Sequence, residues 1–175
     1  MVSDVFFELT GVKIMRDTSH ELQMIRKYGQ DILTSEKFRE AKGQIHHYRT
    51  TVASHCLKTA VAGLKLCSIL RRIGISVDTR MVVRTALLHD LGMVGRSDLY
   101  RNNFECCLKH PGNSASISKQ ICKGIDEESL AAIESHMWPL SVRAPKTKEA
   151  AILCVADKIA SVGDLMPQSM KGQML

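Results

Sequence analysis

Apolar residues recur at spacings of three and four positions along most of the chain, which is the pattern of helices with one buried face. No convincing run of alternating apolar and polar β-branched residues occurs, so the pattern predicts no strand. The clearest predicted helix follows Thr50 or Thr51 and ends before Gly74. Its buried face should consist of Val52, Cys56, Ala60, Leu64, Cys67 and Leu70. We therefore expect an all-α fold.

Capping residues predict where the other helices begin. Ser, Thr and Asp side chains accept hydrogen bonds from the free N–H groups of a first helical turn. On this basis, helices are predicted to start at Ser19, Ser35, Asp78, Ser97-Asp98, Asp126 and Thr147. The second of these should stop near Gly43 and the third near Asp90. Pro111 is predicted to open a further helix that ends at Gly124, because a first turn tolerates proline.

The chain has 175 residues and is 45% hydrophobic, which suits one domain with a sizeable core. We expect a helical extension at residues 1–49 that packs on a core formed by residues 50–175. No run of about 18 apolar residues occurs, so a membrane-spanning helix is not expected. The first residues lack a basic segment followed by a long apolar one, which predicts no secretory signal and a cytoplasmic protein.

The cysteines and the net charge indicate the cellular compartment and the kind of binding partner. The six cysteines form no C-x-x-C pair and mostly lie among apolar residues, so free thiols in a reducing compartment are expected. The net charge is 24 − 18 = +6, but the basic residues are scattered and no aromatic residues interleave with them. This favours a solvated surface over nucleic-acid binding. A mildly positive cleft for a phosphorylated substrate fits the same charge.

The candidate chemistry lies in histidines and aspartates next to apolar helix faces. They are His55, His89, Asp90, His110, His136 and Asp157. Each has an ordinary alternative, because a helix-end pair often caps and a lone histidine is often a hydrogen-bonded core residue. Asp157 is harder to explain in this way, since it follows an uncharged stretch and an unpaired buried charge is costly. Imidazole and carboxylate together suit first-row divalent metals, so the set predicts a metal site.

The order His…His-Asp…His…His…Asp resembles the HD-domain superfamily of metal-dependent phosphohydrolases. The minimal pattern of that superfamily, His…His-Asp…Asp, is matched by His55, His89-Asp90 and Asp157. The resemblance extends over roughly residues 50–163. It implies a single HD-domain-like helical bundle in which residues 50–175 form the metal-binding core.

Two further histidines, His110 and His136, match the branches of the superfamily that hold a second metal. These branches include cyclic-dinucleotide phosphodiesterases and diadenosine-tetraphosphate hydrolases. The resemblance implies that the four minimal-pattern residues hold one ion, that His110 and His136 hold a second, and that Asp90 bridges them. A metal-activated hydroxide would then attack a phosphomonoester or phosphodiester, with a nucleotide as the expected substrate. We expect one or two divalent transition metals. The resemblance favours Fe or Mn, and the ligand types also suit Zn, Co or Ni.

The chain also departs from its relatives. Met93 stands where many of them carry a lysine that contacts the scissile phosphate. The Gly-Tyr-Pro segment of the cyclic-dinucleotide enzymes and the Glu-Asp pair of the guanosine-tetraphosphate hydrolases are absent as well. Another cation must therefore replace the lysine, with Arg96 as the first candidate and Lys158 as the second. Weaker candidates are Arg49 and Arg143, and for lining the cleft, His46 and His47. For each cation, a solvated surface residue is the competing interpretation.

Two other classes of protein fit the same sequence. One is a catalytically inactive HD module that keeps its metal- and nucleotide-binding pocket, which the methionine at position 93 makes plausible. The other is an all-helical interaction protein with a basic surface, which predicts no bound metal. Met-rich helical faces are also compatible with a homodimer.

Overall fold

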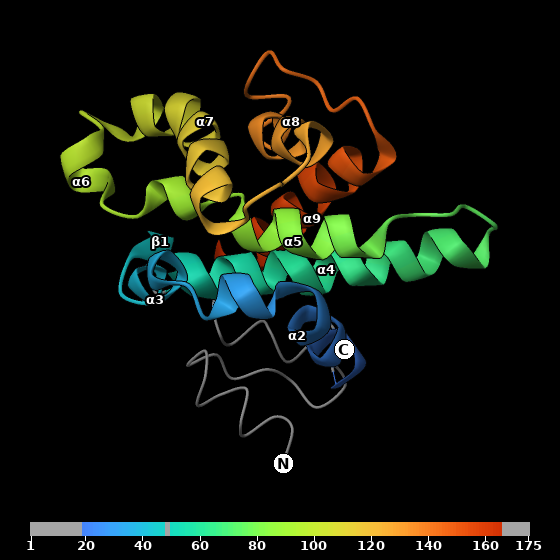
Figure 1. Ribbon diagram of the computed structural model, residues 1–175. Helices are drawn as coiled ribbons and strands as arrows, with labels where there is room; N and C mark the ends of the chain where they lie inside the picture. Colours follow the sequence, from blue (N-terminus) through green and yellow to red (C-terminus); the bar gives the residue numbers. More distant parts are fainter. Residues whose placement is uncertain (1–18, 48–49, 166–175) are drawn as a thin grey trace.

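The computed structural model describes residues 19–47 and 50–165, which fold into a helical bundle with one small hairpin (Figure 1). In chain order the elements are α2 (Ser19–Leu33), α3 (Glu36–Ala41), β1 (Ile45–His47), β2 (Thr50–Thr51), α4 (Val52–Arg72), α5 (Thr79–Leu88), the 3-10 helix η1 (Leu91–Met93), α6 (Arg96–Leu99), α7 (Asn103–Ile121), α8 (Glu127–Ser135) and α9 (Lys148–Leu165). The all-α prediction is thus confirmed. The antiparallel hairpin of β1 and β2, in which Ile45 pairs with Thr51, was not predicted.

Helix α4 is the centre of the bundle and packs against both α5 and α9. In Figure 1, α7 and α8 lie above the α4–α5 pair, and α2 lies below it. The predicted buried face of α4 is confirmed, although its last member, Leu70, is only half-buried. The largest fully buried apolar side chains come from seven elements, α4 among them: Phe38, Ile25, Ile32, Leu57, Leu87, Leu88, Leu91, Ile133 and Leu153. The core is therefore mainly aliphatic, and it holds the helix ends that carry the histidines.

The predicted caps are present at five helix starts. Asp78 accepts a hydrogen bond from the Met81 N–H at 3.0 Å, and Asp126 accepts one from Ser129 at 2.7 Å. The other three caps are Ser35, Thr51 and Thr147. Helix α5 then ends at Leu88, close to its predicted end. These short-range bonds fix where α4, α5, α8 and α9 begin and so fix the register of their buried faces.

The prediction for the segment between α5 and α8 was wrong. Pro111 lies inside α7 instead of opening it, and α7 ends at Ile121, before Gly124. The start of α7 is set by Asn102, which accepts a hydrogen bond from the Glu105 N–H at 2.8 Å, while the Glu105 carboxylate accepts one from the Arg101 N–H at 2.7 Å. These two hydrogen bonds fix the first turn of α7 well before Pro111.

Helix α6 was also predicted imperfectly, because it begins at Arg96 and not at Ser97-Asp98. Its N-cap is Gly95, whose φ of 78° is a left-handed conformation that favours glycine. The capping rule applied to Ser and Asp therefore placed the start too late.

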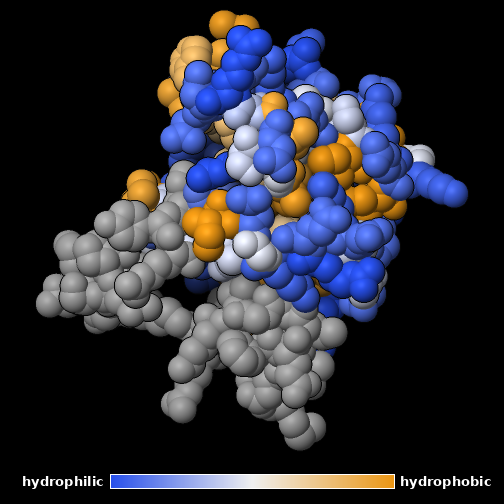
Figure 2. Space-filling model, turned by 90° about the vertical axis from the view of Figure 1, so that its left-hand side faces the viewer, coloured by the Kyte–Doolittle hydropathy of each residue, from blue (hydrophilic) through white to orange (hydrophobic). Residues whose placement is uncertain are grey.

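The surface and the thiols complete the description. All six cysteines are free, and Cys107 is the exposed one. Among the described residues, no helix is long and apolar enough to cross a membrane. The face over α3, β1 and α6 is mainly hydrophilic, with hydrophobic side chains in separate patches (Figure 2).

Candidate metal centre

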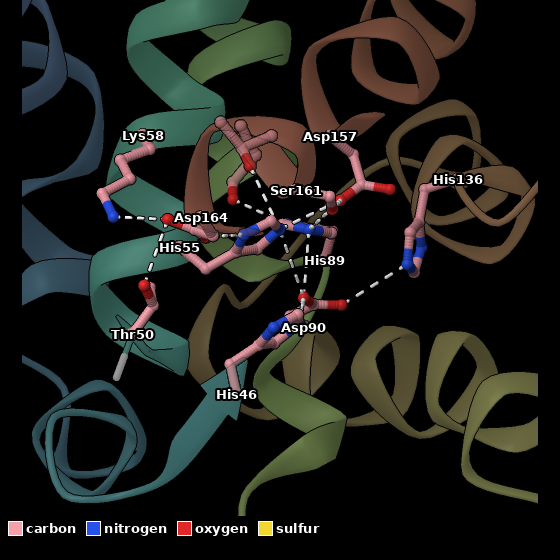
Figure 3. A network of polar contacts seen from close by, with 12 residues as sticks. His46, Thr50, His55, Lys58, His89, Asp90, His136, Asp157, Ser161 and Asp164 are labelled. Carbon is pink, nitrogen blue, oxygen red and sulfur yellow. Dashed lines mark hydrogen bonds and ion pairs between the residues drawn. The ribbon is translucent and has the colours of Figure 1, made fainter. Parts of the chain in front are cut away.

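The six predicted ligands come together in the interior of the bundle, where all of them are buried. They arrive from five segments: the first turn of α4, the end of α5 and the residue after it, the middle of α7, the end of α8 and the middle of α9. Figure 3 shows side chains from several of these segments pointing toward one another around Asp90. Residues far apart in the sequence thus form one cluster.

Helix ends orient two of the histidines. Helices α5 and α8 end at their C-caps His89 and His136, and each Nδ1 donates to the carbonyl three residues earlier, at 2.9 and 2.6 Å. In α7, His110 Nδ1 donates to the Cys106 carbonyl at 2.8 Å. Because a carbonyl only accepts, the proton must lie on Nδ1 in all three rings. Their Nε2 atoms therefore face the cluster, where a neutral ring presents a lone pair.

The two oxygens of Asp90 face two different groups of histidines. Oδ2 lies 3.3 Å from His89 Nε2 and 3.6 Å from His55 Nε2. Oδ1 lies 3.2 Å from His110 Nε2 and 3.4 Å from His136 Nε2. The carboxylate thus lies between two sets of donors, as a bridging ligand requires.

Asp157 completes the first of these two sets. Its Oδ1 lies 3.0 Å from His55 Nε2 and 3.6 Å from His89 Nε2. The side chain is buried in the middle of α9, where a charge is costly without partners. His55, His89 and Asp157 together form one of the groups whose ligand atoms are close enough to share an ion.

The separations of these atoms fit a metal. Metal–nitrogen bonds of about 2.1 Å place ligands at right angles about 3.0 Å apart and tetrahedral ligands about 3.4 Å apart. The Nε2 atoms of His110 and His136 lie 3.0 Å apart, within this range. The Nε2 atom of His89 is buried and has no hydrogen-bond partner among the described residues. A set of facing acceptors needs positive charge, and a divalent cation would supply it to all of them.

The pKa shifts of Asp90 and His110 also favour positive charge next to the Asp90 carboxylate. Burial would raise the pKa of Asp90, but the charge of His89 and hydrogen bonds from other histidines hold it well below its usual value. Burial would lower the pKa of His110, but the hydrogen bond to Asp90 raises it to about 9. His136 has the opposite shift, because burial lowers its pKa to about 4. In the absence of a metal, His110 therefore carries an additional proton near neutral pH while His136 stays neutral, and metal binding at His110 would release that proton.

His46 belongs to the cluster although it was predicted only as a residue that could line a cleft. Its Nε2 lies 2.7 Å from Asp90 Oδ2, and its ring stacks on that of His55 with centroids 4.3 Å apart. The distance of 2.7 Å is shorter than any separation within the predicted ligand set, so we interpret it as a hydrogen bond to the carboxylate. The unpredicted β1–β2 hairpin carries this ring to Asp90.

Asp164 is a second residue that the sequence interpretation missed. Its Oδ2 accepts a hydrogen bond from His55 Nδ1 at 2.9 Å, so the proton of this ring also lies on Nδ1. The available signal was spacing, because Asp164 follows Asp157 by two helical turns and must share its helix face.

The predicted cations lie in different places. Lys158 Nζ donates to Asp157 Oδ2 at 2.9 Å and to the His136 carbonyl at 2.7 Å. Arg96 donates to the His46 carbonyl at 3.4 Å. Both cations therefore form hydrogen bonds with residues of the cluster. The weaker candidates have other positions: Arg143 pairs with Glu134 on α8, whereas Arg49 and the side chain of His47 lie outside the described residues.

Comparison with known proteins agrees with this geometry. The family model described as HD domain matches residues 52–161. No curated protein and no solved structure matches the chain. The matched segment contains all six predicted ligands, begins after His46 and ends before Asp164.

Proposed function

Because the chain belongs to the HD domain family, we propose that it is a metal-dependent phosphohydrolase. The proposed substrate is a phosphomonoester or phosphodiester, with a nucleotide as its class. The observation that carries this proposal is the carboxylate of Asp90, whose two oxygens face two separate groups of imidazole Nε2 atoms. Such an arrangement can hold two ions side by side.

These contacts support a ligand assignment with two sets of residues. The first ion would be held by His55, His89, Asp90 and Asp157, and the second by Asp90, His110 and His136. Imidazole and carboxylate without a thiolate suit Fe, Mn, Zn, Co or Ni, and we propose Fe or Mn. Bound divalent ions would supply hydroxide near neutral pH and stabilise charge on the phosphoryl oxygens.

Three side chains are proposed to serve the reaction itself. Asp90 would fix the relative position of the two donor sets. Lys158, whose side chain is 39% exposed, is hydrogen-bonded to Asp157 and could contribute positive charge to a phosphate at the cluster. Arg96 would do the same from the side of the hairpin, where it is anchored by the His46 carbonyl. These two cations would replace the lysine that many relatives carry at the position of Met93.

The second candidate function is a catalytically inactive module that binds metal and nucleotide. Met93 favours it, because this side chain is buried in η1, three residues after Asp90, and carries no charge for a phosphate. Both candidates require the metal centre, so only turnover separates them.

The test is hydrolysis by the purified protein with added Mn²⁺. The substrates would be a generic phosphomonoester, a generic phosphodiester, nucleoside mono- and polyphosphates and cyclic dinucleotides. We expect phosphate or nucleotide release with at least one of them, and loss of that activity in Asp157→Asn but not in the remote control Asp31→Asn. Metal-loaded protein that hydrolyses no substrate would overturn the enzymatic proposal and support the inactive module.

A further inference from the structure

The four imidazoles of the proposed ligand set differ in which group accepts the hydrogen bond from their Nδ1–H. In His89, His110 and His136 the acceptor is a main-chain carbonyl of the same helix. In His55 it is a carboxylate, Asp164 Oδ2, at 2.9 Å. A carboxylate behind a ligating histidine fixes the ring and makes its other nitrogen a better metal ligand than a neutral carbonyl does. The two sides of the centre are therefore not equivalent.

Contacts between three elements, α9, α4 and β2, hold the Asp164 side chain in place. Its side chain is fully buried in α9, and Figure 3 shows it between His55, Lys58 and Thr50. Oδ1 accepts hydrogen bonds from Thr50 Oγ1 of β2, at 3.1 Å, and from Lys58 Nζ of α4. Each oxygen of Asp164 thus has a donor. A buried carboxylate that is paired in this way keeps its charge and its orientation.

We propose that Asp164 is a positioning residue that makes the site containing His55 the tighter of two metal sites. The inference rests on the proposed metal centre, but it concerns the order of affinities and not the reaction. Asp164 lies beyond the segment that the family model matches, which ends at residue 161. It contacts the ligand His55 through Nδ1 and lies behind it, so its effect must pass through the ring.

Lys58 should act in the opposite direction. Its ammonium shares the carboxylate of Asp164 with His55 and places a positive charge behind the same metal site. Replacing Lys58 by Met removes that charge and leaves Asp164 with its imidazole partner. A charge-based role therefore predicts that Lys58→Met binds the first ion more tightly. A purely structural role predicts that both substitutions weaken binding.

The experiment is a titration of chelator-treated full-length protein with Mn²⁺, in which free Mn²⁺ is followed by electron paramagnetic resonance. We expect two classes of site in the unsubstituted protein. Asp164→Asn keeps an acceptor for His55 but removes its charge, and should weaken the tight class by about 10- to 100-fold while leaving the weak class unchanged. Asp31→Asn is the matched control, because it removes a carboxylate from the ion pair with Arg84, outside the cluster.

The possible results separate cleanly. An unchanged tight class in Asp164→Asn, or an equal loss in both classes, would overturn the inference while leaving the metal centre intact. Failure of the unsubstituted protein to bind Mn²⁺ would instead refute the metal centre, and the inference with it. If Asp164→Asn does not fold, Lys58→Met decides, since tighter binding supports the role of Asp164 and weaker binding contradicts it.

Discussion

Gly92→Ala should destabilise the protein by forcing η1 away from α7. A Cβ atom at Gly92 would lie 2.5 Å from the His110 carbonyl oxygen and 2.6 Å from the Ser114 main-chain nitrogen. Neither neighbour is a flexible side chain, so the backbone itself must move. The same movement would strain the hydrogen bond from the Gly92 N–H to Ser114 Oγ, which is 2.9 Å long.

The expected cost combines two terms. Overpacking of a dense interior costs about 1–3 kcal/mol, and a lost hydrogen bond costs about 1 kcal/mol. We therefore expect Gly92→Ala to lower the free energy of unfolding by about 2–4 kcal/mol. Because His110 lies on the displaced helix, the proposed second metal ion should also bind more weakly. The matched control is Gly112→Ala in α7, where an added Cβ meets nothing within 4 Å. That change should stabilise the helix by up to about 1 kcal/mol.

The assay is urea denaturation of both variants in the presence of chelator, followed by circular dichroism. Omitting metal separates the packing term from any loss of metal binding. If Gly92→Ala has the same free energy of unfolding as the unsubstituted protein, the result would contradict the close packing of η1 on α7. A large loss in Gly112→Ala would instead contradict the open space beside this residue of α7.

Three further changes are expected. His46→Ala should weaken Mn²⁺ binding by about tenfold, because Asp90 loses its donor; unchanged affinity would remove this role. In chelator, the free energy of unfolding should fall as the pH rises from 6.5 to about 9, since His110, with its pKa raised to about 9, then loses its proton; a constant value would contradict the shift. Asp31→Asn should cost less than about 1 kcal/mol at pH 7. Its hydrogen bond with Arg84 lowers the pKa of Asp31, so this cost should vanish as the pH falls well below 3.8; a difference that persists in acid would exclude the ion pair.

The sequence predicted features that depend on a few neighbouring residues. Helix starts at Asp78, Asp126 and Thr147 follow from single side chains that bond to the next turn. The buried face of α4 follows from helical spacing. Asp157 was identified because a carboxylate in an uncharged stretch of helix is costly without a partner. These inferences required no knowledge of which helices touch.

Features that depend on contacts between distant segments could not be predicted in the same way. His46 reaches Asp90 only because a hairpin of two very short strands turns the chain back. Neither strand is long enough to show an alternating pattern. Asp164 does lie on the helix face of Asp157, but its partners come from α4 and β2. The start of α7 was missed because the preference of proline for a first helical turn placed it at Pro111, whereas Asn102 caps the helix earlier in the chain.

Metal content is the measurement that tests the central claim most directly. The protein would be purified without chelator, reconstituted with Fe²⁺ or Mn²⁺, freed of excess ion and analysed by mass spectrometry for metal per chain. Two donor sets around Asp90 predict two equivalents of a divalent transition metal, and about one equivalent in His110→Ala. Less than one equivalent of any transition metal after reconstitution would contradict the account.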